Sequence, residues 1–135
     1  MAVRISSALA GRLAALAAAS PDREVCGLLL GGAGHIRAIE PAVNVAPDPA
    51  TAFEIDPRAV IAAQKRGRER DLAPIGHYHS HPAGDASPSP RDAAAAHGEG
   101  VVWVIVAGGA VRAWITRRGG RHLGRFDPLE LAVTS

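Results

Sequence analysis

The sequence of 135 residues is poor in cysteine, with Cys26 alone. A single cysteine cannot form an internal disulfide, and it cannot supply the two-cysteine pairs of many zinc and iron–sulfur sites. The same scarcity excludes a nucleoside deaminase, whose zinc site needs a Pro-Cys-x-x-Cys pair. Since nothing in the cysteine content argues for an oxidising compartment, we expect a cytoplasmic protein.

Long hydrophobic runs and a strong charge of one sign are also missing. The most apolar early stretch, residues 8–19, is a dozen residues long and contains Arg12, so it is too short to span a bilayer. Fifteen basic residues against thirteen acidic ones give a net charge of +2, which is too small to indicate a nucleic-acid-binding surface. Aromatic residues are few, and we predict that Trp103 and Trp114 pack in the core.

The chain does contain enough apolar material for a core. Hydrophobic residues make up 47% of the sequence and charged residues 21%, which is close to the average of globular proteins. A chain of this length forms one ordinary domain. We therefore expect a single domain over residues 1–135.

Hydrophobic spacing and turn residues predict an alternation of helices and strands. Helices are expected at residues 7–20, 57–70 and 90–97. Strands are expected at residues 25–30, 35–45, 75–81, 101–107, 111–116 and 122–126. In the second helix we expect Val60, Ile61 and Ala63 to face inward and the basic end, residues 65–70, to be solvated. Because several strands are joined as hairpins, this order predicts an α/β protein of the α+β kind, with helices packed on a mixed sheet.

Three of the six histidines lie within residues 76–82. On a strand His79 and His81 project to the same face, about 6.6 Å apart, which is close enough to share one ion. Imidazole suits zinc, and a catalytic zinc typically has three protein ligands and an open water position, so one more ligand is needed. Asp92 is our candidate for that ligand. His77 shares the face but lies deeper in the strand, and we expect it to support the site or pack in the core.

Some of these residues also have a purely structural interpretation. Ser89, Pro90 and Asp92 fit a helix start, as the N-cap serine, the first-turn proline and the N3 acid. The two roles are compatible, because the side chains of an N-cap serine and an N3 carboxylate both point towards the preceding strand end. Cys26 has apolar neighbours, so we predict a buried thiol rather than a nucleophile.

The combined pattern resembles the JAMM/MPN+ zinc metallopeptidases, including their prokaryotic JAB-type members. It consists of His79-x-His81, seven residues, Ser89, two residues and Asp92, preceded by Glu24 at the start of an apolar strand. The resemblance implies the MPN domain, a cytidine-deaminase-like mixed sheet between helices. It also implies one Zn²⁺ per chain with a bound water, the ligands His79, His81 and Asp92, the general base Glu24 and the intermediate-stabilising Ser89.

The implied function is hydrolysis of the peptide or isopeptide bond after the C-terminal Gly-Gly of a ubiquitin-like or sulfur-carrier protein, with no nucleic-acid or membrane partner. Glu24 would take the proton of the zinc-bound water, and Ser89 would donate to the oxyanion. Without the resemblance, Glu24 would be interpreted as a surface glutamate at a strand edge. We expect residues 47–53 to contact the glycine tail and an exposed strand edge to receive it.

Two alternatives from other classes stay open. Residues 79–89 also resemble the RadC family of DNA-repair-associated proteins, although a net charge of +2 gives little electrostatic basis for DNA binding. The other alternative is a non-catalytic MPN scaffold that mediates assembly. Such scaffolds usually lack the zinc ligands that this sequence contains.

Overall fold

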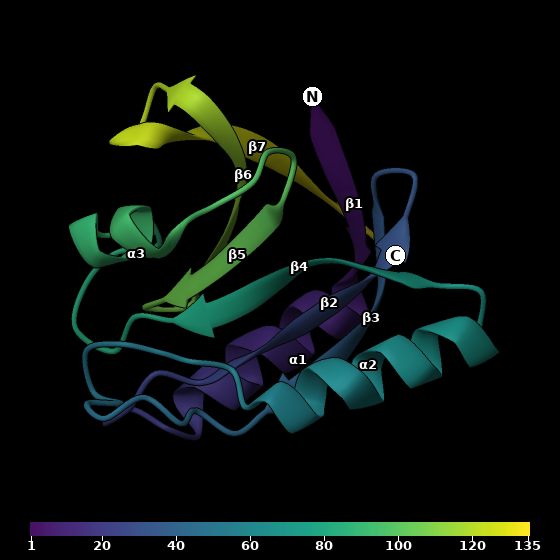
Figure 1. Cartoon of the computed structure of the whole chain (residues 1–135), viewed down its shortest axis with the longest axis horizontal. Coiled ribbons are helices and arrows are strands. Elements are labelled where there is room, and N and C mark those ends of the chain that lie inside the picture. The colour runs from purple at the N-terminus through teal and green to yellow at the C-terminus, as the bar shows by residue number, and fades with distance from the viewer.

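Seven strands form one mixed sheet that closes into a barrel in the computed structural model, which describes all 135 residues (Figure 1). The order around the barrel is β1-β3-β2-β4-β5-β6-β7, and β7 pairs with β1. Pairing is parallel between β1 and β3, β1 and β7, and β4 and β5, and antiparallel elsewhere. The strands are β1 Ala2–Ser6, β2 Cys26–Gly32, β3 His35–Ala42, β4 Ala73–Ser80, β5 Val102–Ala107, β6 Ala110–Gly120 and β7 Gly124–Thr134. The predicted mixed sheet is confirmed.

Three helices pack on the sheet, as predicted, and each begins at a side-chain cap. They are α1 Ser7–Ala18, α2 Pro57–Glu69 and α3 Pro90–Ala95. Their N-caps are Ser6, Asp56 and Ser89, and each side chain accepts a hydrogen bond from a first-turn N–H. Figure 1 shows the short α3 apart from the two long helices, near β7. None of the three helices has the length and hydropathy needed to cross a membrane.

The two faces of the strands carry different cores. Leu13 of α1 packs with Leu29, Tyr78 and Val104 on one face. The neighbouring residues of the same strands point to the opposite face, because side chains alternate along a strand. There α2 covers one cluster and α3 covers another, which contains the buried Trp103 and Trp114. The core positions predicted for both tryptophans are confirmed.

The sequence patterns do not predict β1, and β1 is what closes the barrel. Its five residues bury only Val3 and Ile5, which is too short an alternation to distinguish from chance. Each of the seven strands consequently has a neighbour on both sides. The pairing of β1 with β3 covers only His35 and Ile36, so the rest of β3 has a strand partner on one side alone. The expectation that a glycine tail adds to an exposed strand edge stays a prediction. The last predicted strand, residues 122–126, is also too short, since β7 extends to Thr134.

Helix α2 differs from the expectation at one position. Val60 is partly buried and Ala63 fully buried, as predicted, but the side chain of Ile61 is 66% exposed. The reason is the helical period, which puts Ala63 and Gly67 on one face and turns Ile61 away from it. A Cβ at Gly67 would lie 2.5 Å from the carbonyl oxygen of Leu72, so this face packs closely. The basic end of α2 is exposed, as predicted, except for Gly67.

Candidate metal centre

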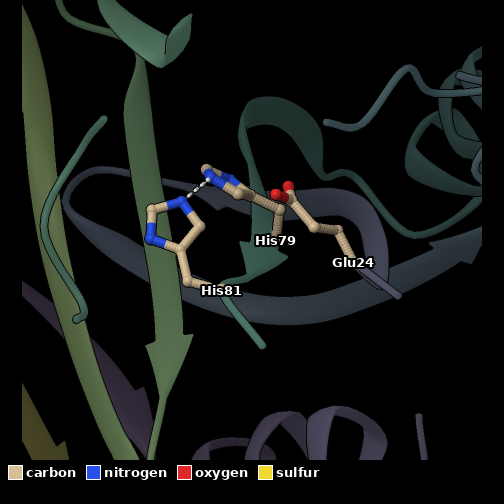
Figure 2. A group of neighbouring side chains, drawn as sticks. All are labelled: Glu24, His79 and His81. Carbon is tan, nitrogen blue, oxygen red and sulfur yellow. Dashed lines mark hydrogen bonds between the residues drawn. The ribbon is translucent and has the colours of Figure 1, made fainter. Parts of the chain in front are cut away.

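The C-terminal end of β4 brings both predicted histidines to the same place. The Nε2 atoms of His79 and His81 lie 3.0 Å apart, and Figure 2 shows both rings pointing towards one point. His79 has no exposed surface and the His81 side chain is 11% exposed. The predicted i, i+2 pair therefore converges at its ring nitrogens, although the two residues are spaced more widely along the backbone.

Asp92 completes a triangle with the two histidines. Its Oδ2 atom lies 3.2 Å from Nε2 of His79 and 3.1 Å from Nε2 of His81. Ligands of a tetrahedral zinc lie about 3.3 Å apart when each bond is about 2.0 Å long. Two imidazoles and a carboxylate at these separations fit one zinc ion, with a fourth position left over.

The start of α3 orients the Asp92 carboxylate. Ser89 and Asp92 form a capping box, in which Asp92 N–H donates to Ser89 Oγ at 3.1 Å and Ser89 N–H donates to Asp92 Oδ2 at 2.9 Å. Burial alone would raise the pKa of Asp92, but its hydrogen bonds with His79 and His81 outweigh burial and hold the pKa well below its ordinary value. The structural interpretation of this motif is correct, and it is compatible with metal binding.

The surroundings shift the pKa values of the two histidines in opposite directions. Burial alone would lower the pKa of His81, but its hydrogen bonds with Asp92 and the Asp85 carbonyl oxygen outweigh burial and raise it. Burial lowers the pKa of His79, and this effect outweighs the neighbouring Asp92. Its Nδ1 atom has no hydrogen-bond partner, and the ring is instead stacked on Phe53 with the centroids 4.2 Å apart. Nδ1 of His81 lies 2.8 Å from the carbonyl oxygen of Asp85, which is the outer contact that usually fixes the ring of a metal-binding histidine.

Glu24 lies beside the triangle and is buried. One carboxylate oxygen of Glu24 and one ring nitrogen each of His79 and His81 lie within 4.8 Å of one another (Figure 2). Only 6% of Glu24 is exposed, and Oε1 has no hydrogen-bond partner. Burial raises the pKa of Glu24 to about 7. The surface-glutamate interpretation is therefore wrong, and the side chain is poised to exchange a proton near neutral pH.

Strand pairing sets the position of Glu24. Cys26 of β2 pairs with His79 of β4 in an antiparallel register, and Ser80 N–H donates to the carbonyl oxygen of Val25 just beyond it. Continuing this register puts Glu24 opposite His81. The predicted buried thiol of Cys26 is confirmed, and burial raises its pKa to about 11.

Asn44 holds the backbone of Glu24, and the sequence patterns do not point to it. Its Nδ2 donates to the carbonyl oxygens of Glu24 at 2.9 Å and Ala52 at 3.0 Å, and its Oδ1 accepts from Ala46 N–H and Glu54 N–H. All four hydrogen-bonding positions of the amide are thus used. The one signal in the sequence is an asparagine before a proline-containing loop, a residue type that satisfies turn backbone.

The loop of residues 47–53 joins the site at two points. Glu24 N–H donates to the carbonyl oxygen of Pro49 at 2.7 Å, and Phe53 stacks on His79. His77 lies deeper, packed against Phe53 and Trp103 with ring centroids 5.5 Å and 4.3 Å away. Burial lowers the pKa of His77 to about 3. The packing role expected for His77 is confirmed.

A groove of about 500 Å³ opens over the site. Glu24, His81 and Ser89 line it beside the metal triangle, and Ala50 and Thr51 come from the loop of residues 47–53. The remaining lining residues are Pro82, Ala83, Gly84, Asp85, Ser87, Pro88, Pro90, His122 and Leu123. Most of these side chains are small, so the groove has room for an extended chain. The sequence patterns predict a strand over residues 122–126, but His122 and Leu123 form the turn between β6 and β7. The sequence-based predictions do not include them in the site.

Comparison with known proteins gives one family. The family model described as prokaryotic homologs of the JAB domain matches residues 6–117. A desampylase of Haloferax volcanii is 37% identical over 91 residues, which cover 66% of this chain and 66% of that protein. A probable TtuB-protein conjugate cleaving protease of Thermus thermophilus is 38% identical over 91 residues, which cover 67% of this chain and 61% of that protein. The matched segment is therefore just under two thirds of each relative's length.

Solved structures support the same fold. The solution structure of a protein from Desulfitobacterium hafniense has a TM-score of 0.85 and 23% identity, with 98% of this chain and 93% of that chain covered. The crystal structure of a JAB1/MPN domain protein from Archaeoglobus fulgidus has a TM-score of 0.58 and 18% identity, with 97% of each chain covered. At these identities the likeness concerns the fold alone.

Proposed function

The chain belongs to the prokaryotic JAB-domain family, and on that premise we propose that it is a JAMM-type zinc metallopeptidase. Its proposed substrate is a ubiquitin-like or sulfur-carrier protein, cleaved at the bond after the C-terminal Gly-Gly. The observation that carries the proposal is the convergence of His79, His81 and Asp92. This triangle lies beside the buried Glu24, and His81 and Glu24 line a groove. The name of the Thermus thermophilus relative, a probable TtuB-protein conjugate cleaving protease, supports cleavage of protein conjugates.

We assign His79, His81 and Asp92 as the zinc ligands and leave Glu24 outside the ligand set. The three ligand atoms lie 3.0–3.2 Å apart, near the edge length of a zinc tetrahedron, whereas Glu24 belongs to a group defined by separations of up to 4.8 Å. When bound, zinc would polarise the scissile carbonyl and make a water molecule more acidic. Its net positive charge would also stabilise the ionised Asp92.

Glu24 fits the role of general base. A buried carboxylate beside the proposed zinc position can accept a proton from the attacking water and return it to the leaving amine. The unpartnered Oε1 is free to make that contact. Asn44 and Pro49 fix the Glu24 backbone through its carbonyl oxygen and its N–H, so the carboxylate keeps its position during the transfer.

Ser89 fits the role of an oxyanion donor. Its Oγ already accepts the N–H of Asp92, which leaves the hydroxyl proton available for a substrate carbonyl oxygen. The serine is part of the groove lining. A donor that is fixed before the reaction stabilises developing negative charge without reorganisation.

The groove supports recognition of a glycine tail. Ala50, Thr51 and Gly84 line it with short or absent side chains, which leave backbone groups accessible, and a glycine tail offers only backbone groups for binding. The loop of residues 47–53 contacts Glu24 through Pro49 and His79 through Phe53, so its backbone groups are within reach of a tail in the groove. We propose that residues 47–53 supply part of the contact with the tail.

The test is cleavage of a carrier protein extended beyond its terminal Gly-Gly. Zinc-loaded wild-type protein should release the extension at the glycine, and wild-type protein treated with a chelator should not. His81→Ala should be inactive in both conditions, since it lacks a ligand. If no form cleaves any of several Gly-Gly carriers, the proposal fails in favour of the scaffold or the RadC-like alternative.

A further inference from the structure

A large apolar side chain lines the otherwise small and polar groove. Leu123 is 48% exposed, and it is the only large aliphatic residue among the 14 that line the groove. Exposing a leucine costs the free protein hydrophobic stabilisation that burial would give. A single exposed leucine would be ordinary elsewhere on the surface, but this one lies beside a candidate catalytic site.

The backbone at Leu123 is strained. Its φ is +54° and that of Gly124 is +68°, and Arg125 N–H closes the turn on the carbonyl oxygen of His122 at 3.1 Å. Two consecutive positive φ values are the pattern that favours Asn-Gly in hairpin turns. Leucine is disfavoured there, so the chain keeps an apolar side chain where asparagine would give a more stable turn. Strain of this kind next to an active site points to function.

The turn is also fixed next to the catalytic serine. The Nε2 atom of His122 lies 2.7 Å from the carbonyl oxygen of Pro88, and Pro88 directly precedes Ser89. His122 N–H donates to the carbonyl oxygen of Phe126 at 2.8 Å, and the His122 ring packs on Trp114 with centroids 5.0 Å apart. Leu123 is therefore held a short distance from the reaction site. Three extended residues span about 10 Å, so a bound chain can reach both places.

We propose that Leu123 contacts an apolar side chain of the carrier protein, in the three residues that precede its Gly-Gly tail. This inference rests on the proposed function. Glycine offers no side chain to bind, and the group beyond the scissile bond differs from one conjugate to another. The residues just before the glycines are the nearest part that all conjugates of one carrier share. An exposed leucine beside the groove matches an apolar residue there.

The experiment compares two variants that relieve the same backbone strain. Leu123→Asn removes the apolar side chain from the groove, and Ala33→Gly is the matched control. Ala33 has a φ of +49° and precedes Gly34 in the turn between β2 and β3, but it is not among the groove residues. Both changes should raise Tm, by about 3 °C for a chain of this size.

The substrates are fluorogenic amides of short peptides that end in Gly-Gly. One leucine is moved through the three positions before the glycines, with serine elsewhere, and an all-serine peptide is the reference. Zinc-loaded wild-type protein and Ala33→Gly should prefer the best leucine peptide about tenfold in kcat/KM, the selectivity typical of one apolar contact. In Leu123→Asn this preference should fall below twofold. Anisotropy measurements of labelled free-acid peptides on metal-free protein should give the same order.

Each result decides between the proposal and its rivals. Equal leucine preference in wild type and Leu123→Asn, or no preference in wild type, would overturn the proposal. A lower Tm in Leu123→Asn, with activity lost in proportion to folded protein, would make the residue merely structural. If wild-type protein cleaves no peptide, cleavage of the extended Gly-Gly carrier decides the proposed function, and the anisotropy series decides whether Leu123 selects an apolar side chain.

Discussion

Two buried carboxylates face the same pair of histidines, and their surroundings act on them in opposite ways. Asp92 is 5% exposed and Glu24 is 6% exposed, so burial alone does not separate them. Asp92 has Ser89 N–H and both imidazoles as partners, and its pKa is held well below the ordinary value. Glu24 has an oxygen without a partner, and burial raises its pKa to about 7.

The difference indicates a division of labour. A carboxylate that stays ionised at every physiological pH suits a metal ion, because ligands bind in their deprotonated form. A carboxylate that titrates near neutrality suits proton transfer. Pairs of neighbouring acids whose environments separate their pKa values often mark the acid–base assignment of an active site. Here the hydrogen-bond partners, rather than the residue types, distinguish Asp92 as the proposed metal ligand from Glu24 as the proposed base.

The largest expected effect is the loss of bound zinc when Asp92 or one of its two histidine partners is replaced. His79→Ala, His81→Ala and Asp92→Asn should each remove the bound zinc, whereas wild-type protein should carry about one zinc per chain by elemental analysis. His97→Ala is the control, because that histidine is exposed and lies outside the triangle. Full zinc retention in the triangle variants would refute the ligand assignment.

Glu24→Gln in metal-free protein tests whether burial raises the pKa of Glu24. The folded-state pKa of about 7 lies above the ordinary value of 4.5, so the ionised carboxylate penalises folding above pH 7. This penalty shrinks as pH falls and disappears below 4.5. The stability gain of the variant over wild type should therefore grow by about 3 kcal/mol between pH 4.5 and pH 8. Chemical denaturation at both pH values measures it, and a pH-independent difference would contradict the cause given for the shift.

Ser89→Ala tests whether the capping box also takes part in catalysis. Turnover should fall by roughly a hundredfold with zinc retained, as for the loss of one oxyanion donor. The lost cap should also cost about 1 kcal/mol of stability. Ser6→Ala removes the same kind of cap from α1, far along the chain from the groove residues, and should lower stability without lowering turnover. If the two variants lose activity alike, Ser89 acts only as a cap.

Cys26→Ala should have the smallest effect. The thiol is buried opposite His79 and its pKa is raised to about 11, so it is neither a ligand nor a nucleophile. Zinc content and turnover should stay within about twofold of wild type, with a stability loss of about 1 kcal/mol for the smaller side chain. Iodoacetamide should label the wild-type thiol only after unfolding. Rapid labelling of native protein would contradict the burial.

The sequence predicts the site better than the details of the fold. His79, His81, Ser89 and Asp92 lie within 14 residues, so a strand period and a helix start suffice to bring them together. Glu24 meets them only through the pairing of β2 with β4, and the resemblance to a family supplied that contact. The four neighbouring residues are predictable because they lie close together in the sequence. The position of Glu24 is not, because it depends on long-range strand pairing.

Other features escape prediction for physical reasons. Strand β1 is short, and the pairing that closes the barrel joins the two ends of the chain. Asn44 acts through hydrogen bonds to backbone groups up to 20 residues away, which leave no pattern in the sequence. Leu123 looks like an ordinary apolar residue until its backbone conformation is known.

The most direct test of the two carboxylates is Glu24→Gln in zinc-loaded protein, with zinc per chain and turnover measured on the same sample. Our assignment predicts about one zinc per chain and a loss of turnover of roughly 10²–10⁴, because the amide keeps the size of the side chain and cannot accept the proton. Loss of the zinc would show that Glu24 is itself a ligand. Undiminished turnover with zinc in place would exclude Glu24 as the base.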